Sequence, residues 1–175
     1  MQIRKWIALL LAFCMLLALS GFGDTATQSS SETIGEENTE SVCTALLQRL
    51  QNSDIDSDCD SLCGYYDADF ALYFEQLYGL DASYVTDGAI FYVKSGSSAD
   101  EISILTPADA GKGATVKAAL QERASRRSRD FTGYNDAEAN KAANASVIQL
   151  GSRFALIIGN DPASIAKQLR QLLKS

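Results

Sequence analysis

The chain has 175 residues, 46% of them hydrophobic, a formal net charge of −7 and no histidine. The excess of acidic side chains argues against nucleic-acid binding, which depends on cations that neutralise phosphates. The absence of histidine excludes Ser-His-Asp triads, Cys-His pairs and every metal site that needs a histidine ligand.

The first 23 residues follow the order that is typical of a secretory signal. Arg4 and Lys5 precede an uncharged apolar run from Trp6 to Leu19, and small residues follow it. This run of 14 residues is shorter than the roughly 20 apolar residues that cross a bilayer, so cleavage is favoured over a retained anchor. The protein is therefore predicted to be extracytoplasmic, either secreted or associated with the cell envelope, and to meet the membrane only through an uncleaved signal.

The end of this signal resembles that of a bacterial lipoprotein in all but one position. Leu19, Ser20 and Gly21 match the residues before the acylated cysteine, but Phe22 stands where that cysteine belongs. A phenyl ring has no nucleophile that could accept a lipid, so we expect ordinary cleavage, which leaves a net charge of −9.

The rest of the chain divides into a leader and one domain. Residues 24–40 are rich in Ser, Thr and Glu, with Ile34 as the single large apolar side chain, which predicts a disordered leader. Residues 41–175 are long enough for a single domain with its own hydrophobic core, and their pattern predicts an α+β domain.

Two helices are expected at the start of this domain. Apolar residues at helical spacing predict a helix over residues 41–51 and another over residues 67–78. Asp67 is a suitable cap for the second helix, and Gly79 can end it in the left-handed conformation. The acidic stretch between the two helices, residues 52–66, is expected to be irregular.

Two hairpins follow, each marked by a pair of short β-branched and aromatic runs. The runs AIFYV (89–93) and EISIL (101–105) predict the first hairpin. The runs VIQL (147–150) and RFALII (153–158) predict the second, which the dipeptide Gly-Ser closes as a two-residue turn.

Each hairpin leads into an amphipathic helix. We therefore predict a four-stranded, mostly antiparallel sheet made of two strand-strand-helix units, with these helices on one face and the N-terminal helices beside it. In this arrangement one side of the last strand packs against the last helix. The residues expected to meet are Phe154, Leu156 and Ile158 on the strand and Ile165, Leu169 and Leu172 on the helix.

Residues 70–174 resemble a known bacterial family. The phrases LYGLDASYV, SADEISIL and VKAALQERASRRSRDFTGY, followed by a hairpin and a closing helix, are similar to domain of unknown function 4358. The resemblance implies a small exported protein, often with a lipoprotein signal, and it brings no catalytic residues or assigned activity. Phe22 departs from the lipoprotein pattern.

Three cysteines remain after cleavage: Cys43, Cys59 and Cys63. An odd number leaves either three free thiols or one disulfide with one free thiol. Their spacing fits no zinc site. A thiol-dependent enzyme or redox protein is one competing function, but the carboxylates of Asp58 and Asp60 are expected to raise the pKa of Cys59 and reduce its reactivity.

A second alternative is a weak calcium-binding module. Asp54, Asp56, Asp58 and Asp60 occupy alternate positions, and carboxylate oxygens are the ligands that calcium prefers. The EF-hand pattern fails, because the sixth position of this stretch is not glycine and the twelfth is not glutamate. A solvated acidic loop is therefore favoured, and no metal or cofactor is expected.

The stretch RASRRSR supplies the candidate binding residues. Arg123, Arg126 and Arg127 share a helical face, where they form either a solvated surface or a patch that docks onto an anionic envelope polymer. We expect all three to be exposed and removable without unfolding. The favoured function is a non-enzymatic exported domain that binds an envelope protein or an anionic envelope polymer through this patch or through the sheet.

Overall fold

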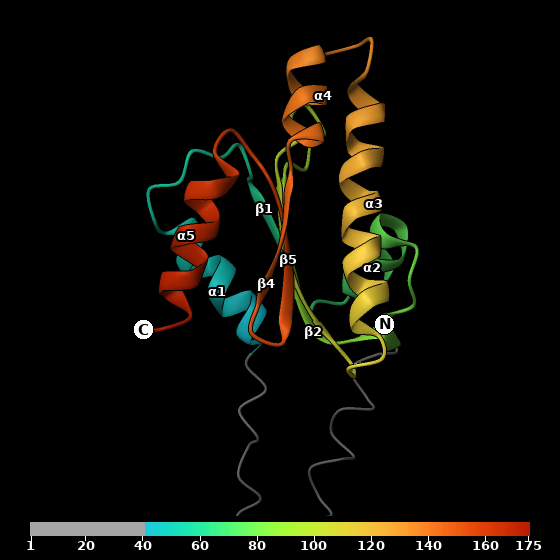
Figure 1. Ribbon diagram of the computed structural model, residues 1–175, viewed down its shortest axis with the longest axis vertical. Coiled ribbons are helices and arrows are strands. Elements are labelled where there is room, and N and C mark those ends of the chain that lie inside the picture. Colours follow the sequence, from blue (N-terminus) through green and yellow to red (C-terminus); the bar gives the residue numbers. More distant parts are fainter. Residues whose placement is uncertain (1–40) are drawn as a thin grey trace, which may run out of the picture. The chain divides into compact units, whose positions relative to one another are not determined.

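A sheet forms the middle layer of the domain, with helices on either side (Figure 1). The structure is a computed structural model that describes residues 41–175, so the predicted signal and leader lie outside the described residues. Within the described part, no helix has the length and apolar character to cross a bilayer. The strands are β1 (Ser61–Gly64), β2 (Val85–Tyr92), β3 (Glu101–Pro107), β4 (Ser146–Leu150) and β5 (Arg153–Ile158). The helices are α1 (Val42–Gln51), α2 (Phe70–Tyr78), α3 (Gly113–Phe131), α4 (Asp136–Ala143) and α5 (Pro162–Leu172), with a short 3₁₀ turn, η2 (Ala82–Tyr84).

The sheet is antiparallel throughout, in the order β1-β2-β3-β5-β4. The α+β class is confirmed, but the prediction of four strands is wrong because β1 adds a fifth. β1 lies in the stretch that was expected to be irregular. Its four residues, SLCG, have little β propensity of their own, and they become a strand by pairing with β2.

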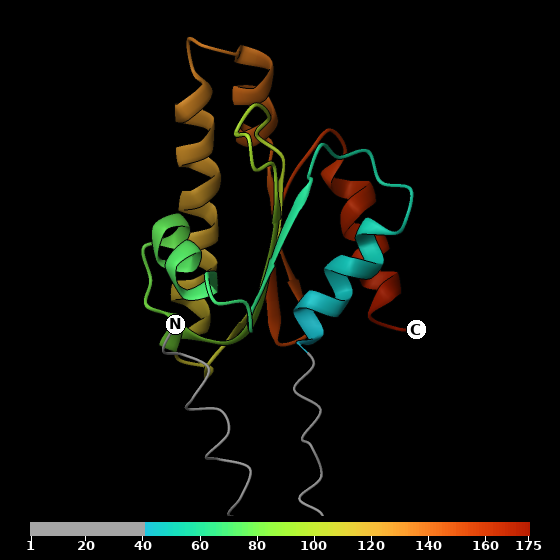
Figure 2. The ribbon, with the colours of Figure 1, turned by 180° about the vertical axis from the view of Figure 1, so that it is seen from behind.

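The prediction that the helices share one face is also wrong. α1 and α5 cover one face of the sheet, and α2, α3 and α4 cover the other (Figures 1 and 2). The physical reason is that β3 and β5 are buried on both sides, and that β5 carries apolar residues at every position from Phe154 to Ile158. Such strands need a helical layer on each face to exclude water.

The packing of β5 shows the consequence of this arrangement. Phe154, Leu156 and Ile158 do share one side, but that side faces α3 and its neighbours instead of α5. The other side of β5 meets the apolar face of α5 at the residues Ala155, Ile157, Ile165 and Leu169. The expected contacts of β5 are therefore displaced by one residue, because an unbroken apolar run carries no sign of which side faces which helix.

Local signals predicted the chain reversals well. Gly79 ends α2 with φ of +66°, and Gly151 has φ of +63° in the two-residue turn between β4 and β5. Both values lie in the left-handed region, which glycine enters without steric cost. Asp67 does not cap α2, since its Oδ2 instead accepts a hydrogen bond from the backbone N–H of Gly64 at 2.7 Å.

Candidate functional site

Arg123 is part of a buried polar network between α3 and the sheet. Its Nε and Nη2 donate to Oε2 of Glu101 at 2.9 and 2.6 Å, and the Glu101 side chain is 1% exposed. The hydroxyl of Tyr78 donates to the other oxygen of Glu101 at 2.9 Å and lies 2.7 Å from Ser103. Burial, followed by the Glu101 carboxylate, raises the pKa of Tyr78 well above its ordinary value. Arg123 therefore neutralises a carboxylate within the fold.

Arg126 and Arg127 are also turned toward the protein. Arg126 donates to the carbonyl oxygen of Leu77 near the end of α2. Arg127 donates to the carbonyl oxygen of Ser98 at 2.6 Å and stacks over the ring of Phe131 at 4.8 Å. Both side chains are half-buried. The expectation that the three arginines are exposed is wrong, because each one binds a group of a neighbouring element.

A second buried network joins α4 to the start of β3. Nζ of Lys141 lies 2.7 Å from Asp100, 3.0 Å from Glu138 and 3.3 Å from the hydroxyl of Ser98. A serine beside a lysine can act as a nucleophile only where the lysine is neutral. Burial lowers the pKa of Lys141, but its hydrogen bonds to Asp100 and Glu138 outweigh this effect and raise the pKa above its ordinary value. The pair is therefore a structural contact.

The three cysteines are free thiols. Sγ of Cys43 lies 3.5 Å from Oγ1 of Thr106, and Sγ of Cys59 donates to the carbonyl oxygen of Phe91 at 3.3 Å. Burial raises the pKa of Cys43 and of Cys59 to about 12, and that of Cys63 to about 11. Because the thiolate is the nucleophile, these environments suppress thiol chemistry at neutral pH.

These pKa shifts predict slow modification of the native protein. At pH 8, iodoacetamide is expected to label Cys43, Cys59 and Cys63 more than 10-fold more slowly in the folded protein than in urea, because the thiolate fraction falls tenfold per pKa unit. The raised pKa values also make the free energy of unfolding depend on pH. Their contribution is fully present below pH 9, the pKa of an unfolded thiol, and is lost as the pH rises toward 12, because only the unfolded thiols then ionise. Intact-mass kinetics measure the labelling, and equal rates in the two states would contradict the prediction.

The acidic stretch after α1 is extended, with its carboxylates facing solvent. Asp54, Asp56, Asp58 and Asp60 are exposed, and the residues between them are half-buried. Asp60 accepts hydrogen bonds from the N–H of Lys94 and the hydroxyl of Ser61, which lower its pKa. Among residues 41–175, no group of three or more acidic or thiol side chains is placed to hold a metal ion.

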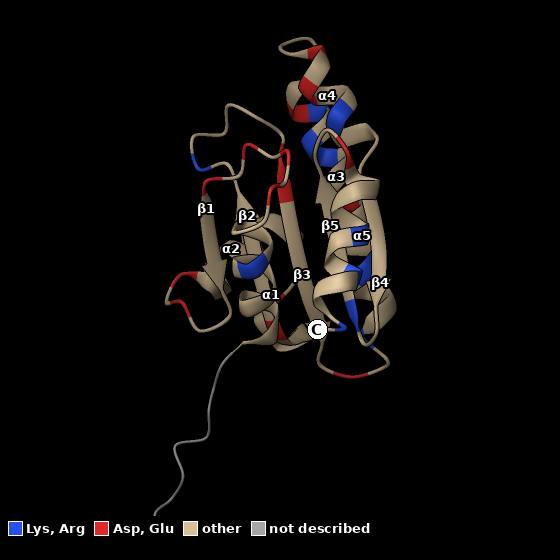
Figure 3. Cartoon of the chain, turned by 90° about the vertical axis from the view of Figure 1, so that its left-hand side faces the viewer, with Lys and Arg blue, Asp and Glu red and all other residues tan. Residues whose placement is uncertain are grey.

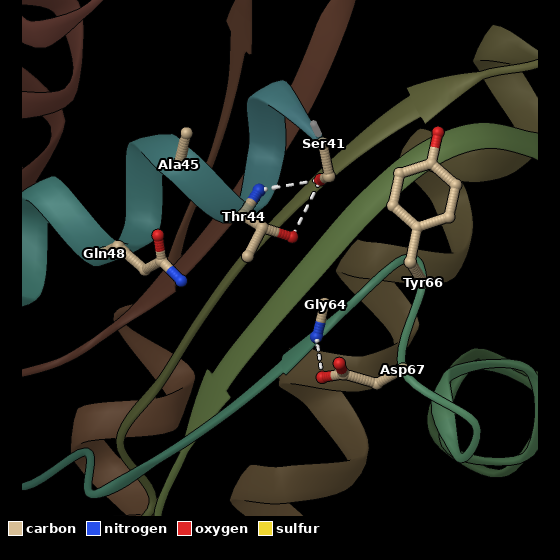
Figure 4. A pocket seen from close by; sticks show the side chains of 7 residues that line it. All are labelled: Ser41, Thr44, Ala45, Gln48, Gly64, Tyr66 and Asp67. Carbon is tan, nitrogen blue, oxygen red and sulfur yellow. Dashed lines mark hydrogen bonds between the residues drawn. The ribbon is translucent and has the colours of Figure 1, made fainter. Parts of the chain in front are cut away.

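A cavity of about 170 Å³ lies beside the N-terminus of α1 (Figure 4). Most polar groups at its wall are already paired. The hydroxyl of Ser41 donates to Asp87 at 2.5 Å and accepts from the N–H of Thr44 at 2.9 Å. Asp67 accepts a hydrogen bond from the backbone N–H of Gly64. The hydrogen bonds of this cavity therefore fasten α1 to the sheet and leave little for a ligand.

The outer surface of α1 and α5 has a different character. The charged side chains of these helices and of the three residues that follow α5 are all cations, namely Arg49, Lys167, Arg170 and Lys174. We call these four residues the cationic layer; blue segments mark α1 and α5 in Figure 3. All four are exposed, and none forms an ion pair with a carboxylate of the described residues.

Arg49 links the two helices of this layer. Its Nη1 donates to the carbonyl oxygen of Leu172 at 3.2 Å, and its Nη2 donates to the hydroxyl of Ser175. A groove of about 290 Å³ lies beside it, with mostly apolar walls formed by α1 and the end of α5. Val42 lines this groove and is 45% exposed. Unpaired positive charge and open apolar surface thus adjoin at the cationic layer.

The buried networks and four of the five strands, β2 to β5, fall inside a known family profile. The profile described as Domain of unknown function (DUF4358) matches residues 69–159. The chain belongs to this family. No curated protein and no solved structure matches the chain. In this DUF4358 protein the matched span contains Glu101, Arg123 and Lys141, whereas α1 and α5 lie outside it, so the match ends before the expected residue 174.

Sequence reasoning selected the densest run of arginines and missed the cationic layer. Lys167, Arg170 and Lys174 do carry a signal, because they recur at spacings of three and four residues opposite the apolar stripe of Ile165 and Leu169. Such spacing predicts exposure, whereas the density of a charged run does not. The partners of Arg123 and Lys141 carry no comparable signal, since they are distant in sequence.

Proposed function

We propose that this DUF4358 protein is a bacterial, exported, non-enzymatic domain that binds a component of the cell envelope. The observation that carries the proposal is the state of the buried reactive groups. Lys141 is held protonated, and the thiols and Tyr78 have raised pKa values. The buried carboxylates Asp100 and Glu101 are paired with cations. These groups stabilise the fold, which leaves the surface as the place where the protein acts.

The location outside the cytoplasm is supported by the sequence before the domain. Arg4, Lys5 and the apolar run that follows have the order of a secretory signal, and Phe22 removes the site of lipid attachment. The competing functions have less support. A thiol-dependent enzyme needs a thiolate that burial suppresses at Cys43 and Cys59, and a calcium module needs carboxylates that converge.

Export and processing test this proposal. The full chain, expressed in its native cell, is expected in the extracytoplasmic fraction. Its intact mass should correspond to a mature chain that starts near residue 21 or 24 and carries no lipid. The control variant Phe22→Cys restores the acceptor thiol and is expected to move the protein to the membrane fraction with a lipid-sized mass increase. An unprocessed wild-type chain in the cytoplasm would contradict the proposal.

A further inference from the structure

We infer that the cationic layer binds a linear polyanion of the cell envelope along α5. This inference rests on the proposed function for the location of the polymer, and on the charges of α1 and α5 for the binding itself. In a chain of net charge −7, these two helices carry cations without a single acidic side chain. Such a local reversal of charge opposes the field of the rest of the molecule and attracts anions to this surface.

The cations of α5 form a line. Lys167 and Arg170 lie on the side of α5 opposite the buried residues Ile165 and Leu169, and Lys174 lies in the turn that follows the helix. With a rise of about 1.5 Å per residue, Lys167 and Arg170 are displaced by about 4.5 Å along the helix axis, and Lys174 follows beyond the end of the helix. A flexible chain that carries an anion in every repeat can place several of its charges along such a line at once.

The exposed side of α5 favours a polymer over a folded protein partner. The residues around the line of cations are Ala163, Ser164, Gln168 and Gln171. Protein interfaces depend on buried aromatic or large apolar anchors, and these four residues supply none. The apolar groove beside Arg49 lies between α1 and the end of α5. The binding energy of the exposed side of α5 has to come from charge, which is the way a polyanion is bound.

The surroundings of the layer favour a thin polymer over a membrane. Asn160 donates a hydrogen bond to exposed Asp56 at 3.1 Å, and Asp161 caps the start of α5. These carboxylates flank the cations, so a flat anionic surface that touched α5 would also face them. A polymer that follows the helix meets the cations first, and charges farther than about 8–10 Å away are screened at physiological salt.

A charge-matched pair of variants tests the inference. The layer variant is Lys167→Gln/Arg170→Gln/Lys174→Gln. The control variant removes three exposed cations elsewhere, at Lys94, Lys117 and Arg129, and therefore has the same net charge. The probe is lipid-free poly(glycerol phosphate), titrated at several salt concentrations, with thermal melts to confirm that both variants fold.

The layer variant is expected to bind at least 10-fold more weakly than the wild type, and the control variant within about 2-fold, because the layer variant loses the groups that neutralise the polymer. The slope of log affinity against log salt should fall in magnitude by about 2 in the layer variant alone. Equal losses in the two variants would overturn the inference, since net charge would then explain the binding.

Three further outcomes separate the alternatives. Binding to vesicles of phosphatidylglycerol without binding to the polymer would overturn the inference in favour of a lipid surface. No binding to either probe would also overturn it, and the proposed function would stand if the chain were still exported and retained at the envelope. A cytoplasmic chain that nevertheless binds the polymer through α5 would instead leave the surface intact and remove the envelope as its location.

Discussion

Replacement of Arg123 by glutamine is expected to lower the free energy of unfolding by about 3–5 kcal/mol at pH 7, because it leaves a buried carboxylate without its cation. Glu101 is 1% exposed and Arg123 is 13% exposed, so water cannot solvate the charge that remains. Tyr78 and Ser103 still contact the carboxylate in the variant, but neutral hydroxyl groups do not cancel its charge. The loss is a large part of the stability of a typical domain.

Urea denaturation with matched variants measures this effect. Arg129→Gln is the control, because Arg129 pairs with Glu122 at 2.7 Å on the surface, with side chains 62% and 58% exposed. Exposed pairs contribute about 0–1 kcal/mol, so the control should differ little from the wild type. The double variant Arg123→Gln/Glu101→Gln should recover much of the loss, since neither charge remains. If Arg123→Gln behaved like the control, Arg123 would be a surface residue after all.

The residues that pair in the two buried networks could not be predicted from the sequence. Glu101 and Arg123 are 22 residues apart, and Asp100 and Lys141 are 41 apart, so no local period connects them. Their pairing depends on how α3 and α4 lie across the start of β3. Dense arginines on a helix look like a solvent-facing surface in sequence, but their long side chains reach groups of neighbouring elements in the structure.

The elements with strong local signals were predicted, and those without them were not. The helices after the two hairpins and the turn at Gly151 follow from spacing and turn chemistry, and all are confirmed. α4 was missed because its sequence, DAEANKAA, has little apolar surface, and α4 is held by its packing on α3 and by Lys141. Tertiary contacts thus stabilise a helix that intrinsic helix propensity alone does not predict.

Leu156→Ala is expected to lower the free energy of unfolding by about 2–5 kcal/mol, because it empties a fully buried site in the middle of the sheet. Leu156 belongs to the cluster between β5 and α3, together with Leu120. Leu169 of α5 belongs to the cluster on the opposite face. The sequence alone does not tell whether Leu156 faces α3 or α5. The loss of stability in Leu156→Ala would be similar in either case.

Double-mutant cycles in urea distinguish them. Leu156→Ala combined with Leu120→Ala is expected to be non-additive by about 0.5–3 kcal/mol, because the two residues belong to one packed cluster. Leu156→Ala combined with Leu169→Ala is expected to be additive within about 0.5 kcal/mol, because the sheet separates the two sites. Coupling to Leu169 without coupling to Leu120 would mean that β5 presents the opposite side to each helical layer, and the arrangement of helices on both faces would have to be revised.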